Sequence, residues 1–392
     1  MTETSPIAGL HAATADLDPP LAALDLTALR ANAADLIRRA NGVPVRVASK
    51  SVRCRAVLEE VLGAGLTARG GFAGIMSYSL AEAIWLARLG ARDVLLGYPT
   101  VDRAALAELA ADATLLRSIT LMIDDPTQLD LIRAAVGTDL VRPRVCLDVD
   151  ASLRLGPLHL GVRRSPVHTP EQAARLAATA MRRGFEVLGV MTYEAQIAGL
   201  PDANPAVRLV KWASAAEITR RRTLVLDAVR SETGKLEIVN SGGTGSLEVS
   251  AADPEVTEVT AGSGLYVPTL FDHYRAFTPR PALYFATSVL RRPTPTIATV
   301  FAGGYIASGP TGPARVPKPV WPKGLRLLGT EGAGEVQTPL SGAAQSRIGD
   351  RVWFRHAKAG ELCERFDRLH MVAADGARAT VPTYRGEGQC FG

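Results

Sequence analysis

Apolar and polar positions follow two different rhythms along the first two thirds of the chain. Short runs of apolar, largely β-branched residues recur between longer stretches whose apolar residues repeat every three to four positions. The short runs predict strands and the longer stretches predict amphipathic helices. We expect strands at 43–48, 74–76, 93–96, 118–122, 145–149, 188–192, 236–240 and 256–259, and helices at 53–62, 79–89, 103–112, 169–183 and 207–230.

This alternation amounts to about eight strand–helix units, the size and order of a (β/α)8 barrel. After about residue 275 the helical periodicity ends, and short runs at 282–290, 296–301 and 351–354 lie between turns rich in Gly and Pro. The fold class predicted is therefore α/β, a (β/α)8 TIM-type barrel with a second, C-terminal all-β domain. We expect the barrel at 22–272 and the β domain at 1–21 and 273–392, with 310–322 as an irregular loop.

Composition places the chain among ordinary globular proteins. It is 47% hydrophobic and 21% charged, and no apolar run reaches the roughly 20 residues that a membrane span needs. The first residues lack the features of a secretory signal. Four cysteines lie far apart without a CxxC pair, which fits a reducing compartment. We expect a cytoplasmic protein without a membrane partner.

The net charge of +5 and a pI near 9.1 raise the question of nucleic-acid binding. The basic residues are dispersed, however, and the runs at 163–164 and 220–222 are short. Residues 220–222 fall in a helical stretch and indicate a solvated face. We therefore expect no nucleic-acid partner.

Lysine is scarce in this chain, because only six of the 44 basic residues are lysines. Lys50 ends the apolar run that starts at Val43. A lysine amine can act as a nucleophile, whereas an arginine guanidinium cannot. Since active sites of barrels lie at the C-terminal ends of strands, Lys50 is the leading candidate for covalent chemistry. The alternative is a surface lysine whose ammonium reaches solvent.

Two glycine-rich turns follow the last two expected barrel strands. The first is Asn240-Ser-Gly-Gly-Thr-Gly-Ser246, and the second lies in Glu258-Val-Thr-Ala-Gly-Ser-Gly-Leu-Tyr266. Such turns expose backbone N–H groups that can surround a phosphate. Either turn alone is a weak signal, but adjacent turns late in a barrel predict a phosphate site.

Further candidates lie at two other strand ends. Tyr193 and Glu194 follow the strand at 188–192, where an aromatic ring can pack on a flat heterocycle and a carboxylate can orient a neighbour. The alternative for Tyr193 is a ring that caps the barrel core. Arg154 follows the strand at 145–149 and could meet a phenolate or carboxylate, with Arg163 as its rival.

Taken together, these residues resemble the fold-type III (alanine racemase-like) pyridoxal-phosphate enzymes, and within them the D-threonine aldolase and D-serine dehydratase branch. The resemblance covers about residues 20 to 385. It rests on the order and spacing of Lys50, the strand end Met191-Thr-Tyr-Glu194, and the two glycine-rich turns.

The resemblance implies that Lys50 carries pyridoxal 5'-phosphate as a Schiff base. It also implies a homodimer with an amino acid as its small-molecule substrate. The residues that it assigns to the cofactor are Lys50, Arg154, Tyr193, Ser241, Gly242, Gly243, Thr244, Gly262, Ser263, Gly264 and Tyr266, and the candidate catalytic residues are Lys50, Tyr193 and Lys358.

The sequence departs from that branch in the β domain. Members typically carry Pro-Asn-His-x-Cys or -Asp, whose His and Cys or Asp bind a divalent metal. In this chain the two positions fall on Lys358 and Gly360, neither of which is a metal ligand. We favour loss of the metal, with the Lys358 ammonium in its place. The alternatives are a shifted site built from His356 with Glu361 or Cys363, and a Lys358 that is merely an exposed lysine.

The expected reaction is retro-aldol cleavage or β-elimination of a D-β-hydroxy amino acid, the work of an aldolase or of a dehydratase (deaminase). An amino-acid racemase or epimerase, which needs a second base such as Tyr193 or Tyr266, is an alternative. A non-catalytic pyridoxal-phosphate-binding protein is another, although such proteins usually lack the β domain.

Overall fold

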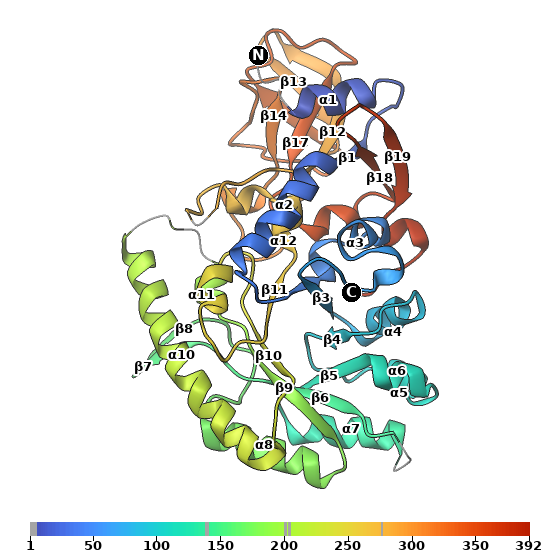
Figure 1. Ribbon diagram of the computed structural model, residues 1–392. Coiled ribbons are helices and arrows are strands. Elements are labelled where there is room, and N and C mark those ends of the chain that lie inside the picture. The colour runs from blue at the N-terminus through green and yellow to red at the C-terminus, as the bar shows by residue number, and fades with distance from the viewer. Residues whose placement is uncertain (1–5, 138–140, 200–201, 203–204, 276) are drawn as a thin grey trace.

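A computed structural model describes residues 6–137, 141–199, 202, 205–275 and 277–392. The chain forms a barrel surrounded by helices and a separate sheet domain that sits beside one end of it (Figure 1). Both parts of the predicted fold are confirmed.

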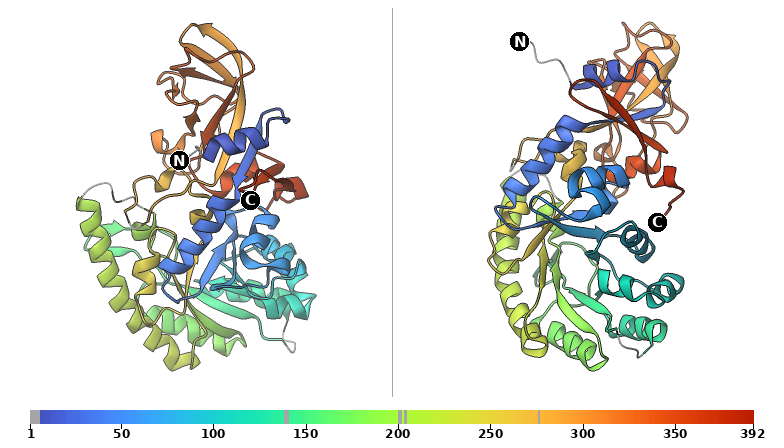
Figure 2. Two further views of the ribbon diagram at one scale, coloured as in Figure 1. Left: turned by 45° about the horizontal axis from the view of Figure 1, so that its top comes forward. Right: turned by 45° about the vertical axis from the view of Figure 1, so that its right-hand side comes forward.

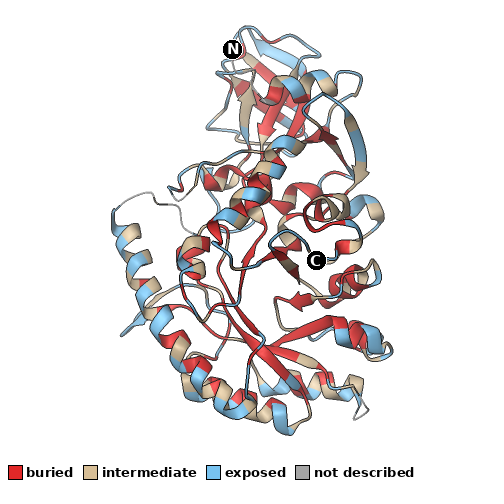
Figure 3. Cartoon of the chain, in the orientation of Figure 1, coloured by how far each residue is buried: buried red, intermediate tan, exposed pale blue. Residues whose placement is uncertain are grey.

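Eight parallel strands close the barrel in the order β10-β11-β2-β3-β4-β5-β6-β9. Most residues of these strands are buried, because helices cover the outer face and side chains fill the interior (Figure 3). The strands are β2 (Val45–Ala48), β3 (Phe72–Ser77), β4 (Val94–Leu96), β5 (Ile119–Ile123), β6 (Arg144–Asp148), β9 (Glu186–Thr192), β10 (Ile238–Ser241) and β11 (Glu258–Ala261).

Helices connect these strands and form the outer layer. Several begin where the sequence provides a cap: Asp125 with Gln128 and Thr169 with Gln172 form capping boxes. The helices of this part are α2 (Leu26–Arg39), α3 (Arg55–Leu62), α4 (Leu80–Arg88), α5 (Arg103–Ala110), α6 (Ala113–Ser118), α7 (Pro126–Val136), α8 (Pro170–Arg182), α9 (Ala195–Ala198), α10 (Pro205–Thr233), α11 (Leu247–Ala251) and α12 (Ser263–Tyr266).

One barrel connection contains an extra hairpin. Between β6 and α8, strands β7 (Leu153–Leu155) and β8 (Leu158–Leu160) pair only with each other and form an antiparallel ribbon. The chain then returns to the barrel, where Ser165 Oγ donates to the carbonyl of Asp148 at 2.6 Å. The path of this returning segment determines which arginine side chain lies at the C-terminal ends of the barrel strands.

The second domain is a nine-stranded sheet with helix α1 (Pro6–Ala13) packed beside it. Its strands are β1 (Leu21–Asp25), β12 (Leu283–Thr294), β13 (Ile297–Phe301), β14 (Lys318–Trp321), β15 (Arg326–Leu327), β16 (Gln337–Ser341), β17 (Arg351–Arg355), β18 (Arg368–Val372) and β19 (Arg378–Pro382). Strand β14 lies in the segment expected to be an irregular loop, and its Pro319 conceals the strand pattern because proline lacks an N–H donor.

Strand β1 belongs to the sheet domain, where it pairs with β12 and β18. The chain crosses into the barrel at α2, so the boundary expected at residue 22 falls inside a strand. One hydrophobic cluster contains buried residues of both parts, such as Leu24 and Phe285 from the sheet and Val47 from the barrel. The two parts also lie in contact in both turned views (Figure 2).

Within the described ranges, none of the helices combines the length and the apolar character needed to cross a membrane.

Candidate active site

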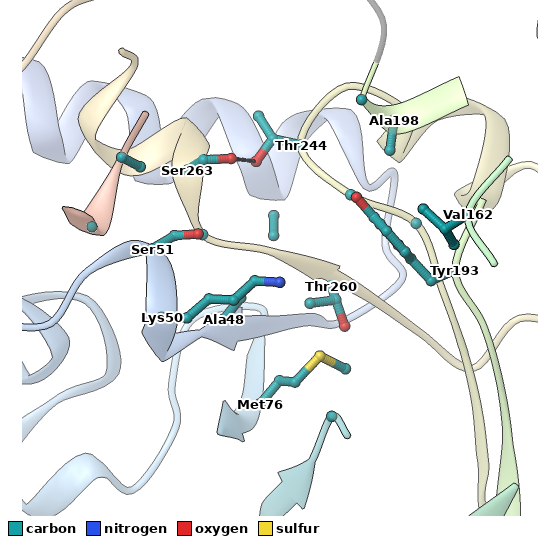
Figure 4. A pocket seen from close by; sticks show the side chains of 18 of the residues that line it. Ala48, Lys50, Ser51, Met76, Val162, Tyr193, Ala198, Thr244, Thr260 and Ser263 are labelled. Atoms are coloured by element: carbon teal, nitrogen blue, oxygen red, sulfur yellow. Dashed lines mark hydrogen bonds between the residues drawn. The ribbon is translucent and has the colours of Figure 1, made fainter. Parts of the chain in front are cut away.

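A cavity of about 490 Å³ lies at the C-terminal ends of the barrel strands. Strand ends supply most of its wall, and the sheet domain closes it on one side through Ser308, Arg315 and residues 358–361. Three sequence-predicted features meet there: Lys50, Tyr193 and the two glycine-rich turns (Figure 4). This is the usual position of active sites in barrels of this kind.

Lys50 follows β2 within a short 3-10 turn, Ser49–Ser51. The hydroxyl of Ser49 donates to the carbonyl of Met76 at 3.0 Å and ties this turn to β3. The Lys50 side chain points into the cavity (Figure 4), where Nζ donates a short hydrogen bond to the hydroxyl of Tyr98. The turn thus presents an amine to the interior of the cavity.

Gly360 lets the sheet domain approach this turn closely. A Cβ atom at Gly360 would lie 2.1 Å from the backbone oxygen of Lys50, which is too close for any side chain. The family resemblance implies a metal ligand at the position of Gly360, and in this chain a close backbone contact takes up the space at that position.

Two aromatic rings and one guanidinium form another part of the wall. Tyr193, at the end of β9, turns its ring toward the cavity from the side opposite Lys50 (Figure 4). Arg164 places its guanidinium 5.6 Å from the Tyr193 ring centroid and 5.9 Å from that of Tyr98. Burial raises the pKa of the Tyr193 phenol. A neutral ring is therefore available to pack on a flat heterocycle.

The glycine-rich turns form a cradle beside the Lys50 amine. Gly242, Gly243, Thr244, Gly262 and Ser263 line the cavity, and the Ser263 hydroxyl donates to Thr244 Oγ1 at 3.2 Å (Figure 4). A Cβ atom at Gly243 would lie 2.8 Å from that of Ala198, and one at Gly262 only 2.5 Å from the oxygen of Ala48. Glycine is required at both positions.

Glu194 holds the first turn from behind. This carboxylate is buried and accepts hydrogen bonds from Gly242 N at 3.1 Å, from Ser241 Oγ at 3.0 Å, and from the Ser250 hydroxyl. Arg222 donates to Ser241 Oγ at 2.7 Å and pairs with Asp253. The sequence-based suggestion that the carboxylate orients a neighbour agrees with this arrangement.

Four of the predicted residues lie outside the cavity wall. Ser241 and Gly264 are buried behind the turns. Tyr266 is fully buried and donates to the carbonyl of Val52 at 2.9 Å, so it packs in the core between the two domains. Arg154 pairs with Asp150 at 2.5 Å and lines an adjoining hollow.

Arg163 lines that same hollow, so neither arginine proposed from the sequence reaches the cavity wall. Arg164 lines both the hollow and the cavity. Two residues of the cavity wall were not predicted from the sequence: Arg164 and Tyr98, which follows β4. The strand-end rule that identified Lys50 and Tyr193 would have found Tyr98, but the position of Arg164 depends on the hairpin.

Acidic groups at the end of β6 complete the floor. Burial, and then the neighbouring charge of Asp124, raise the pKa of Asp148 to about 7, although Arg164 acts against this shift. Asp150 is also buried, but hydrogen bonds from His168 and Ser152 outweigh this and lower its pKa strongly. Asp148 is thus the carboxyl group of the wall that can hold a proton near neutral pH.

Lys358 lines the cavity from the sheet domain, and its side chain is nearly half exposed. Its Nζ donates to Ser308 Oγ at 2.5 Å and lies 3.2 Å from Glu361 Oε1. His356 and Cys363 are both buried, and Cys363 Sγ lies 4.0 Å from the Tyr266 hydroxyl. In the part of the chain that the structure describes, no group of three or more His, Cys, Asp or Glu side chains could hold a metal ion. His356, Glu361 and Cys363 thus do not form a three-ligand metal site.

Comparison with known proteins agrees with this geometry. Residues 24–269 match the family model described as alanine racemase, N-terminal domain. Nothing among the curated proteins matches the chain. The D-threonine aldolase of Filomicrobium marinum has a similar structure, with a TM-score of 0.79 at 21% identity over 95% of this chain and 96% of that one.

Two further solved structures show how far this fold extends. D-threo-3-hydroxyaspartate dehydratase from Delftia sp. HT23 gives a TM-score of 0.75 at 20% identity, over 94% of this chain and 97% of that one. The alanine racemase of Clostridium difficile 630 gives a TM-score of 0.63 at 14% identity, over 94% of this chain and 99% of that one. At these identities the likeness establishes a shared fold.

Proposed function

Because the chain belongs to the family defined by the N-terminal domain of alanine racemase, we propose that it is a pyridoxal-phosphate-dependent lyase acting on a β-hydroxy amino acid. The observation that carries the proposal is the position of Lys50. Its amine enters a cavity that also contains an aromatic wall and a glycine-rich cradle. These are the three features that a flat, phosphorylated aldehyde needs.

The residues present fit this cofactor. The Lys50 amine would attach its aldehyde, and the ring of Tyr193 would pack against its heterocycle. Gly242 to Thr244 and Gly262 to Ser263 would surround its phosphate, because the close contacts at these glycines leave room for backbone alone. When bound, pyridoxal phosphate supplies an electron sink for the electron pair left at the substrate Cα.

The chain's own groups handle the protons and the orientation. The Lys50 amine lines the cavity and would be the base that accepts the substrate Cα proton. Lys358 enters from the opposite domain, so its ammonium can donate a hydrogen bond to a substrate hydroxyl on that side. Ser308 and Glu361 hold this ammonium in place. We derive no step through a metal ion.

The colour of the purified protein tests the cofactor assignment. We expect visible absorbance after addition of pyridoxal phosphate, and expect borohydride reduction to attach the cofactor mass to the peptide that contains Lys50. Lys50→Ala should remove both signals, whereas Lys235→Ala, which changes an exposed lysine, should keep them. A colourless wild-type protein, or label on another lysine, would contradict the proposal.

Product analysis tests the reaction. D- and L-threonine, serine and phenylserine would be assayed separately for aldehyde plus glycine and for ammonia plus keto acid. We propose D-β-hydroxy substrates, as the names of the structural neighbours suggest. Exchange of the substrate Cα proton without either product would favour a racemase. Binding of the cofactor without conversion of any substrate would favour a non-catalytic binding protein.

The role of Lys358 is tested by chelation together with elemental analysis. If Lys358 stands in place of a metal, activity should persist in chelator and no stoichiometric divalent metal should be found. Lys358→Ala should then lower kcat while leaving cofactor occupancy unchanged. Stoichiometric manganese or zinc would contradict this role.

A further inference from the structure

The hydroxyl of Tyr98 lies against the amine of Lys50. Lys50 follows β2 and Tyr98 follows β4, so the contact spans the mouth of the barrel past the end of β3. Lys50 Nζ donates a hydrogen bond to the Tyr98 hydroxyl and lies 5.0 Å from its ring centroid. The proposed function gives Tyr98 no role.

Charged and titratable groups face Tyr98 from several parts of the barrel mouth. Lys50 approaches from β2, Arg164 stacks over its ring, Asp148 lies at the end of β6, and Tyr193 at the end of β9. Burial raises the pKa of the Tyr98 phenol. The charge and hydrogen bond of Lys50, helped by Arg164, outweigh burial and Asp148 and hold this pKa below its usual 10.0.

We infer that Tyr98 is the proton partner of Lys50, an inference that rests on the proposed function. One proton moves between the two groups. In one form Lys50 is an ammonium and Tyr98 a phenolate; in the other Lys50 is a neutral amine and Tyr98 a phenol. Transfer breaks one N–H bond, forms one O–H bond and leaves the total charge of the pair unchanged, so no further reactant is needed.

This exchange gives Lys50 the form that its chemistry requires. A neutral amine is needed both to attach an aldehyde and to accept a proton from a substrate. Tyr98 acts through Lys50 and does not itself touch the substrate in this scheme, so it is a positioning residue. The Arg164 guanidinium, 5.9 Å from the ring centroid of Tyr98, also favours the phenolate form.

Ultraviolet titration of tyrosinate tests the pair directly, in the full-length chain freed of cofactor. We expect one tyrosine that ionises below pH 10 in the wild type and is missing in Tyr98→Phe. In Lys50→Ala the same tyrosine should ionise above the usual range, because burial then acts without the opposing ammonium. Tyr305→Phe, a control in the sheet domain, should retain the early ionisation.

The inference is overturned if Tyr98→Phe titrates like the wild type, or if Lys50→Ala leaves the early ionisation in place. This measurement does not depend on the cofactor. An early Tyr98 titration in a chain that never attaches pyridoxal phosphate would contradict the proposed function and still support the proton pair.

A second measurement follows the rate at which added pyridoxal phosphate attaches, over a range of pH. We expect Tyr98→Phe to reach the same final occupancy as the wild type, but roughly 10-fold more slowly near neutral pH. The attachment rate of Tyr98→Phe, plotted against pH, should lack the ionisation that ultraviolet titration finds in the wild type. Equal rates and identical profiles in the two proteins would overturn the inference.

Discussion

Glu82 is a carboxyl group sealed directly behind the turn that carries Lys50. It has no exposed surface, and it accepts a hydrogen bond from Tyr78 N at 2.8 Å. Burial, only partly offset by hydrogen bonds from Tyr78 and Ser49, raises its pKa to about 7. Glu82 therefore retains a proton in the folded protein at a pH where the unfolded chain has lost it.

This shift predicts that stability depends on pH in a definite direction. The contribution of Glu82 to stability is fully present below pH 4.5, the usual pKa of a glutamate. It is lost as the pH rises through about 7, the pKa in the folded protein. The wild type should lose up to about 3 kcal/mol over that range relative to Glu82→Gln. Urea unfolding at several pH values measures this difference, and the exposed Glu232→Gln is the control. A difference that does not change with pH would contradict the assignment.

At the level of elements, the β7–β8 hairpin determines which arginine serves the site. It carries Arg154 away from the cavity, and the returning segment brings Arg164 over the two tyrosine rings. We expect Arg164→Ala to weaken pyridoxal-phosphate binding about 10-fold, because the Tyr193 ring that would pack on the cofactor loses its cation–π contact. Arg154→Ala is the matched control and should bind nearly as the wild type does. Fluorescence titration compares cofactor binding by the two variants. Weaker binding by Arg154→Ala than by Arg164→Ala would refute the placement of Arg164 in the cavity.

The contact between the sheet domain and the Lys50 turn gives another prediction at this scale. Gly360→Ala places a methyl group where the backbone oxygen of Lys50 lies. We expect a loss of about 1–3 kcal/mol in the free energy of unfolding, as for other overpacked sites. Gly329→Ala, which meets no atom within 4 Å, serves as the control in the same urea titration. Equal stability of the two variants would show that this contact is not tight.

The elements and the site were predictable from the sequence to different degrees. Strand ends of a parallel barrel gather at one mouth, and therefore Lys50, Tyr193 and the glycine turns could be assigned together. Arg164 could not, since sequence distance from a strand does not show where a hairpin returns the chain. Tyr266 was misplaced for a related reason: a residue just past a strand end can point into the domain interface as well as into the cavity.

On the scale of the whole molecule, the two domains share one hydrophobic cluster. We therefore expect them to unfold together, because neither can expose its side of the cluster alone at small cost. Trp85 reports on the barrel and Trp353 on the sheet domain. Urea curves of single-tryptophan variants should coincide with those from circular dichroism. Two separated transitions would show that the domains unfold independently.

The homodimer implied by the family resemblance remains a prediction. Sedimentation velocity of the 41.5 kDa chain should give a species of about twice that mass. A monomer at micromolar concentration that retains full cofactor occupancy would contradict it.

Two different segments of the sheet domain contact the Lys50 turn and line the cavity, and this has an evolutionary consequence. Gly360 fixes the distance between this domain and the reactive lysine, while another segment of the domain, which carries Ser308 and Arg315, lines the cavity without touching that lysine. Mutations in that segment can therefore retune substrate preference without disturbing the lysine. Such separation makes the scaffold evolvable, and directed evolution of new specificities should begin there.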